Sequence, residues 1–242
     1  MILDLTVADK IKQLHREGLR PSEGLVKTIT RAGAAAFTPL LDLATQAELL
    51  HEDEPECYAP IHALRLLGEV GSAEMIEPLL REYPVELDDE DEELPQMWVE
   101  EAPQIIGRLG EAAVEPLWRI ADDDTWPIVA RSSALIALTY VTAVAPATRD
   151  ALVAALRERL AAAEDKAYAS HLVIALANLG VNDAYAEVMA LYRAGRIDQE
   201  IIPAGAVRQL LLTDSTKRLA CAKHPLWERY DQHGPFPEER EI

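Results

Sequence analysis

The chain has 242 residues, of which 49% are hydrophobic and 27% charged, and its 42 acidic and 23 basic side chains give a formal net charge of −19. A chain of this length can bury the core of one or two domains. The negative charge disfavours nucleic acid and an anionic membrane surface as partners, because both are bound through basic surfaces. Only 5% of the residues are aromatic, which favours packed helices over a β-sandwich or barrel.

The N-terminus, the longest uncharged stretch and the cysteines give three expectations about targeting and compartment. Asp4 interrupts the apolar start of the chain and no small-residue cleavage site follows, so we expect no signal peptide. The longest uncharged stretch, residues 132–148, is too short to span a bilayer and predicts a buried helix. Cys57 and Cys221 form no metal knuckle or CxxC motif, so we expect two unpaired thiols in the cytoplasm.

After an amphipathic segment at about residues 7–17, which predicts an N-terminal capping helix, a repeat organises the chain. Three segments share a Gly, a short run of small residues and then Pro-Leu, and their prolines are 39 and 38 residues apart. They are GAAAFTPLLDLA from Gly33, GSAEMIEPLLREY from Gly71 and GEAAVEPLWRIA from Gly110. Weaker copies follow around Ala155 and Ala190. Each segment predicts the first helix of a repeat.

A second helix is predicted in each repeat by apolar residues at helical spacing that end in Leu-Gly or a similar pair. Examples are ALRLLG ending at Gly68, QIIGRLG ending at Gly110 and VIALANLG ending at Gly180. The final Gly is typical of a helix C-cap. The turn between the two helices is acidic, and an acidic residue there favours the start of the next helix. Two helices in about 35 to 42 residues are typical of solenoid repeats.

The segment DDDTWPIVARSSALIALTYV shows the repeat most clearly. It resembles HEAT repeats, particularly the short bacterial kind found in phycobilin lyases, with Asp124 and Arg131 where HEAT repeats have an Asp and an Arg that bond neighbouring turns. Pro60 and the stretch 101–103 depart from this pattern. The resemblance covers roughly residues 22–212 and implies an all-α fold, a right-handed α-solenoid of about five to six HEAT-like helix pairs. We expect one solenoid over 1–212, followed by a C-terminal cap and partly extended tail over 213–242.

In families of this kind the second helix of each pair lines the concave face. The resemblance therefore implies a concave face built from residues 22–32, 57–69, 94–109, 125–141, 166–179 and 198–212. The candidate binding residues on it are Tyr58, His62, Arg65, Trp98, Glu101, Gln104, Arg108, Arg131 and His171. Arg131 also has a structural alternative, as the repeat arginine bonded to Asp124.

The negative charge is concentrated, because residues 83–124 hold 14 acidic and two basic side chains. We expect an acidic edge beside the concave face that attracts a basic partner. Its residues are Asp88, Asp89, Glu90, Asp91, Glu92, Glu93, Asp122, Asp123 and Asp124. The alternative is a solvated loop that only keeps the protein soluble. The run DDEDEE lacks the Gly and the alternating spacing of a Ca²⁺ loop.

No residue pattern points to a catalytic, metal or cofactor site. The sequence has no GxSxG, Walker or GxGxxG motif. HEAT-like iron hydroxylases use several His-Glu dipeptides, whereas this chain has one, at His51. We therefore expect no metal, no cofactor and no catalytic residue, and a non-catalytic scaffold for a protein or peptide with a basic surface.

Three alternatives stay open. One is an enzyme resembling the HEAT-like alkylpurine DNA glycosylases, for which Trp98, Trp126, Tyr168 and Asp124 would be the aromatic and acidic groups. Another is an accessory factor resembling the bilin lyases. The third is an acidic mimic of nucleic acid. The sequence leaves the oligomeric state open.

Overall fold

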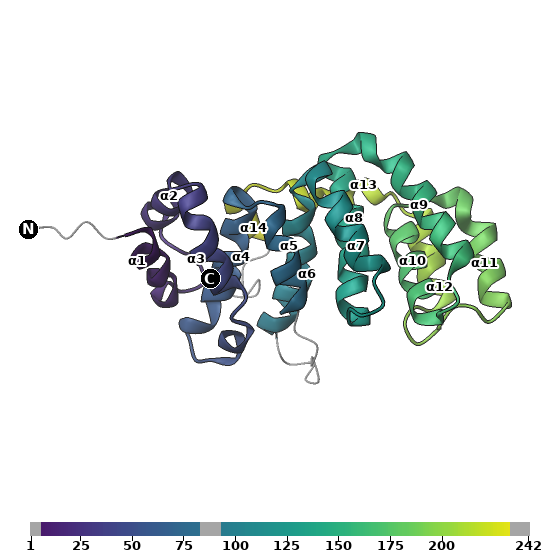
Figure 1. The fold of residues 1–242 in the computed structure, drawn as a ribbon, viewed down its shortest axis with the longest axis horizontal. Coiled ribbons are helices and arrows are strands. Elements are labelled where there is room, and N and C mark those ends of the chain that lie inside the picture. Colours follow the sequence, from purple (N-terminus) through teal and green to yellow (C-terminus); the bar gives the residue numbers. More distant parts are fainter. Residues whose placement is uncertain (1–5, 83–92, 233–242) are drawn as a thin grey trace, which may run out of the picture. The chain divides into compact units, whose positions relative to one another are not determined.

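The computed structural model describes residues 6–82 and 93–232 (Figure 1). Within these ranges the regular secondary structure is entirely helical, so the predicted all-α class is confirmed. The α-helices are α1 (Val7–Ile11), α2 (Glu23–Arg31), α3 (Ala34–Ala44), α4 (Ala59–Val70), α5 (Ile76–Arg81), α6 (Glu93–Gly107), α7 (Val114–Asp122), α8 (Ile128–Val144), α9 (Arg149–Ala162), α10 (Lys166–Asn178), α11 (Tyr185–Arg193), α12 (Ala204–Leu212), α13 (Ser215–Leu219) and α14 (Leu226–Gln232). None of the described helices is long and apolar enough to cross a membrane.

The contacts divide the chain into two compact units. Unit 1 consists of residues 1–109 together with 224–242, and unit 2 consists of residues 110–223. The C-terminal helix α14 therefore belongs to unit 1, although unit 2 separates it from the rest of unit 1 in the sequence. Cys57 and Cys221 are not joined in a disulfide, and Cys57 is buried.

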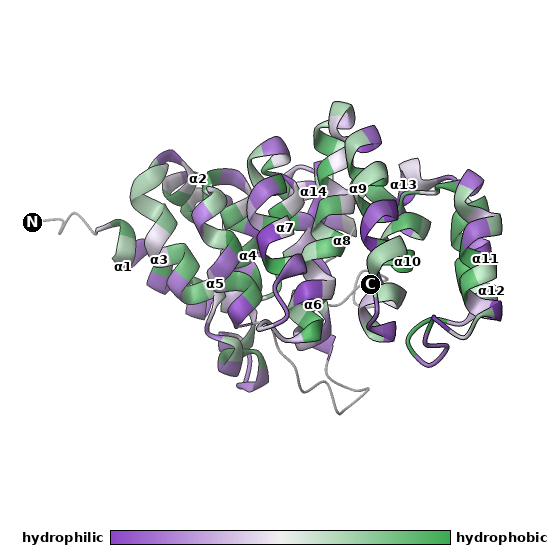
Figure 2. Cartoon of the chain, turned by 45° about the vertical axis from the view of Figure 1, so that its right-hand side comes forward, coloured by the Kyte–Doolittle hydropathy of each residue, from purple (hydrophilic) through white to green (hydrophobic). Residues whose placement is uncertain are grey.

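In unit 1, α3 packs against α4, α4 lies beside α6, and α1 covers α3. The apolar faces of these helices form the core, in which Leu40, Leu64 and Ile105 are fully buried. Trp98 ties α6 to the end of α3, because its indole Nε1 donates to the carbonyl oxygen of Ala44 at 2.9 Å. Hydrophobic and hydrophilic residues alternate along most of these helices (Figure 2).

Unit 2 repeats one arrangement three times. Helices α7, α9 and α11 pack against α8, α10 and α12 respectively, and α10 lies between α8 and α12. Buried Leu and Ala residues at helical spacing on α8 and α10 fill the space between the helices. The second helices predicted at 125–141, 166–179 and 198–212 correspond to α8, α10 and α12.

Glycines end two of the predicted helices but not a third. Gly110 and Gly180 follow α6 and α10 with a φ of +63°, a conformation that glycine adopts without strain. The prediction that Gly68 ends its helix is wrong, since α4 continues to Val70. A Cβ at Gly68 would lie 3.0 Å from Cδ1 of Ile105, so this glycine instead lets α6 approach α4 closely.

Acidic residues at the turns bond to the backbone, as expected for helix starts. The carboxylate of Asp165 accepts hydrogen bonds from the backbone N–H groups of Ala167 and Tyr168 at the start of α10. Asp123 and Asp198 each accept from the backbone N–H two residues further on. These carboxylates stabilise the turns, whereas Asp88, Asp89, Glu90, Asp91 and Glu92 of the predicted acidic edge lie outside the described residues.

Candidate binding surfaces

The predicted binding residues of unit 1 are mostly interior. Tyr58, His62, Arg65, Trp98 and Glu101 are between 0% and 4% exposed. Gln104 and Arg108 retain partial exposure. Part of this burial comes from α14, which packs on α4 and whose side chains reach His62 and Gln104, whereas Trp98 is held against the end of α3 through Ala44. We call the set His62, Arg65, Glu101, Gln104 and Arg108 the α4–α6 face.

His62 is hydrogen-bonded through both ring nitrogens. Its Nδ1 lies 2.8 Å from the hydroxyl oxygen of Tyr230 on α14, and its Nε2 lies 2.8 Å from the carbonyl oxygen of Gly18. A carbonyl only accepts, so Nε2 carries the proton and the Tyr230 hydroxyl donates to Nδ1. Burial lowers the pKa of His62 from 6.5 to about 4. The imidazole is therefore neutral at pH 7 and serves to anchor α14.

Arg65 and Glu101 form an ion pair inside unit 1. The Arg65 Nε donates to Oε2 of Glu101 at 2.9 Å, and a second bond joins Nη2 to Oε1. Their side chains are 0% and 5% exposed. The guanidinium also lies over the ring of Tyr230, 4.5 Å from its centroid. A buried charge requires this kind of partner, because its transfer from water is costly.

Gln104 and Arg108 complete the contact with the C-terminal segment. The Arg229 Nη1 donates to Oε1 of Gln104 at 3.1 Å, and the Arg108 Nη1 donates to the carbonyl oxygen of His224 at 2.7 Å. Arg108 also pairs with Glu69 at 2.9 Å. Four of the residues predicted to contact a peptide, His62, Arg65, Gln104 and Arg108, thus contact residues 224–230 of the same chain.

In unit 2 the two predicted binding residues, Arg131 and His171, are both partly exposed. Arg131 donates to the carbonyl oxygen of Ala121 at 3.0 Å, in place of the bond to Asp124 that the resemblance implies. His171 Nδ1 lies 2.8 Å from the Ser132 hydroxyl, which links α10 to α8. Burial lowers the pKa of His171.

Beside them lies an arrangement that the sequence did not indicate. The guanidinium of Arg159 lies over the ring of Trp118, 3.8 Å from its centroid, and makes two hydrogen bonds of 2.7 and 2.6 Å with Asp122. Tyr168 donates to the same carboxylate at 3.0 Å, and Arg131 lies over its ring at 4.3 Å. We call these five residues the aromatic–arginine cluster.

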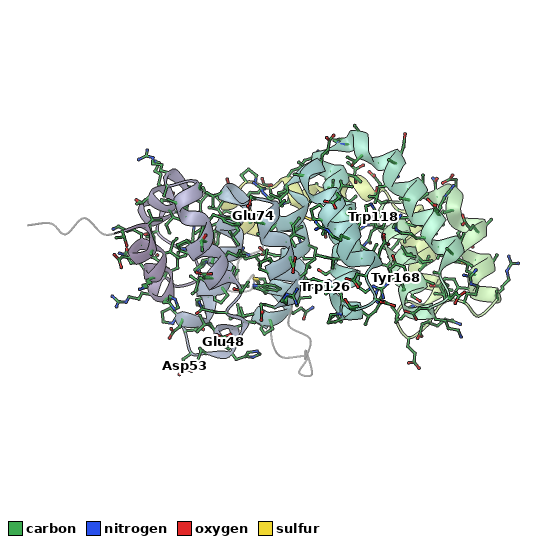
Figure 3. All side chains as sticks on the ribbon, in the orientation of Figure 1. Glu48, Asp53, Glu74, Trp118, Trp126 and Tyr168 are labelled. Carbon is green, nitrogen blue, oxygen red and sulfur yellow. The ribbon has the colours of Figure 1, made fainter. Side chains whose placement is uncertain are left out.

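The cluster joins α7, α8, α9 and α10, and its members are partly exposed or exposed. Trp118 and Tyr168 are labelled in Figure 3, with Trp126 on the same unit. Burial, with Asp122 as the second cause, raises the pKa of Tyr168 to about 12. The sequence signal for the cluster was Trp118, where the other two Pro-Leu segments have Leu. Trp, Tyr and Arg are the side chains most enriched in the energetic centres of protein interfaces.

Exposed carboxylates lie on the turns that precede α8, α10 and α12. Asp124, Glu164 and Glu200 are one exposed acid from each of these three turns. Of the predicted acidic edge, Glu93, Asp122 and Asp124 are exposed and Asp123 is partly exposed. That residues 88–93 and 122–124 lie along one acidic edge stays a prediction.

A metal site and a base-stacking site each place requirements on the described residues. They contain no group of three His, Cys, Asp or Glu side chains placed to hold a metal ion. Trp98, one of the aromatic residues considered for a glycosylase, is 0% exposed and cannot stack on a base. Trp126 and Tyr168 keep partial exposure.

Comparison with family models, with curated proteins and with solved structures found no match for this chain. The candidate surfaces are therefore interpreted from their own chemistry.

Proposed function

We propose that the protein is a non-catalytic binding protein built from HEAT-like helix pairs, and that it holds a protein segment with a basic surface on unit 2. The supporting observation is that Trp118, Tyr168 and Arg131 keep partial exposure within reach of acidic turns. In unit 1, by contrast, Trp98 is interior and Tyr230 of α14 lies on His62 and Arg65.

The charges of unit 2 determine what kind of partner fits. Within the cluster, Arg159 is already neutralised by Asp122, so it contributes a flat stacking surface more than a free positive charge. Asp124, Glu164 and Glu200, on turns of the same unit, are exposed. A partner with Lys or Arg side chains would gain long-range attraction from these carboxylates and would bury apolar area on the rings.

The test separates charge at this site from charge in general. The variant D124S/E164S/E200S removes three exposed acids from unit 2 whose side chains are not needed for the caps formed by Asp123, Asp165 and Asp198. The control E48S/D53S/E74S removes three exposed acids from unit 1, all labelled in Figure 3.

Both variants and the unaltered chain are used to capture proteins from the source cells, and the captured proteins are quantified by mass spectrometry at several salt concentrations. A fluorescent Lys- and Arg-rich peptide provides a defined probe in parallel. We expect about tenfold weaker binding for the unit 2 variant, since each exposed pair contributes roughly 0.2–1 kcal/mol, and a weaker salt dependence. Equal losses in the two variants would refute a specific site on unit 2.

The aromatic residues give a second readout. We expect W126A, at a partly exposed position beside the cluster, to weaken capture by about tenfold or more with little change in salt dependence. If D124S/E164S/E200S weakened the salt dependence of capture but W126A had no effect, the binding would instead be nonspecific attraction by the net charge.

A further inference from the structure

Helix α14 is held on unit 1 by few residues. Among its described side chains Leu226, Arg229 and Tyr230 are buried, and the others are exposed at least in part. The segment Leu226–Gln232 is only seven residues long and mostly polar. Leu226 and Tyr230 belong to the hydrophobic core of unit 1, and the position of α14 also depends on specific polar anchors.

The anchors are directional hydrogen bonds and a ring contact. The Tyr230 hydroxyl donates to His62, Arg229 donates to Gln104, the carbonyl oxygen of His224 accepts from Arg108, and the Tyr230 ring lies on the Arg65 guanidinium. Outside the face, Arg20 pairs with Asp231 and lies over the Trp227 ring at 4.8 Å.

Part of the face beneath α14 is held together without it. The ion pair between Arg65 and Glu101 and the bond from His62 to Gly18 involve no residue of α14. When α14 leaves, the Arg65 guanidinium, which also bonds to Tyr230, loses a partner that water can replace, as do Nδ1 of His62, Oε1 of Gln104 and Nη1 of Arg108. The face therefore remains formed and wettable when vacant.

The segment that links α14 to unit 2 is short and partly exposed. Residues 224 and 225 lie between the helical turn that ends at Lys223 and the start of α14, and Lys223 and Pro225 are exposed. We propose that the α4–α6 face is a binding site for a helix of another protein that presents an adjacent Arg-Tyr pair, and that α14 occupies it as an intramolecular ligand. This inference concerns unit 1 and does not depend on the function proposed for unit 2.

Competition within the chain sets the expected size of the effect. A tethered segment has an effective concentration of about 1 mM, so a free peptide at about 10 µM with the same contacts occupies roughly 1% of the sites. Replacing the buried Tyr230 by Ala weakens the tethered helix by about 100-fold. The same peptide then occupies about half of the sites.

The experiment adds a fluorescent peptide with the sequence of residues 222–232, AKHPLWERYDQ, to the full-length chain and measures anisotropy. We expect binding to rise from near zero in the unaltered chain to about half in Y230A, and to about a tenth in Y230F, which loses only the hydroxyl anchor. The matched control Y192F removes a tyrosine hydroxyl that bonds to the carbonyl oxygen of Ile202 in unit 2, and it should bind no more peptide than the unaltered chain. A peptide carrying R229A and Y230A should not bind.

A second measurement needs no variant. In hydrogen exchange of the unaltered chain, α14 amides should exchange at least about tenfold faster than the α4 amides, because α14 opens alone. Equal protection of α14 and α4, or no peptide binding by folded Y230A and Y230F, would overturn the proposal. If Y230A fails to fold, Y230F and the exchange data decide.

Discussion

The buried ion pair between Arg65 and Glu101 makes a strong prediction about unit 1. The variant E101Q keeps the shape of the side chain but removes its charge, which leaves the Arg65 guanidinium buried without its counter-charge. Breaking one partner of such a pair costs about 3–5 kcal/mol. Since a domain is stable by only about 5–15 kcal/mol, this loss should shift the unfolding midpoint strongly.

Replacing both charges has a different outcome. In R65M/E101M neither charge is buried, and the side chains have similar volume, so we expect stability within about 2 kcal/mol of the unaltered chain. The assay is urea unfolding followed by circular dichroism, with hydrogen exchange in α4 to assign the change to unit 1. E100Q, an identical change at the adjacent exposed residue, should cost less than about 0.5 kcal/mol. The reasoning fails if E101Q is as stable as E100Q, or if R65M/E101M loses as much stability as E101Q does.

Three further predictions concern pH, charge and backbone. Folding lowers the pKa of His62 from 6.5 to about 4, so the unfolded chain takes up a proton before the folded chain as the pH falls. The free energy of unfolding should therefore fall between pH 6.5 and 4 by about 3 kcal/mol more than in H62Q. Urea titrations in which the two chains lose equal stability would disprove this. D122N should lower the pKa of Tyr168, because the charge of Asp122 is one cause of the raised value, and burial should still hold this pKa above its usual value. An NMR titration of the Tyr168 ring in which the pKa did not move would contradict this. G180A should lower the free energy of unfolding by about 1 kcal/mol more than G195A. Both glycines have a positive φ, but only a Cβ at position 180 would lie within 3.2–3.3 Å of other atoms. Equal melting temperatures of the two variants would refute this prediction.

The periodic part of the fold could be predicted from the sequence because it depends on local pattern. Apolar residues at helical spacing predicted the positions of α4, α6, α8 and α10 to within a few residues. The Leu-Gly ending failed only at Gly68, where the glycine is needed for contact with Ile105 on another helix. Such a contact between helices distant in sequence leaves no local signal.

The binding residues were harder to predict for the same reason. His62 and Arg65 were identified as polar residues on the inner helix of a repeat, but their burial depends on Tyr230, which lies 168 residues from His62 in the sequence. The periodicity fades before residue 224, so it gave no reason to place α14 on α4. In unit 2, Arg159 could not be linked to Asp122 and Trp118 before the packing of α9 was known.

The polar character of the α4–α6 face has a physical consequence for how the face is used. If stability alone mattered, apolar residues in place of Arg65 and Glu101 would serve as well or better. An apolar face would also bind α14 more permanently and, when vacant, would expose surface prone to aggregation. Paired charges and a neutral histidine instead remain soluble when α14 departs and discriminate between helices by their hydrogen-bonding groups. A face of this composition is therefore better suited to exchanging one helix for another than to fixing α14 in place.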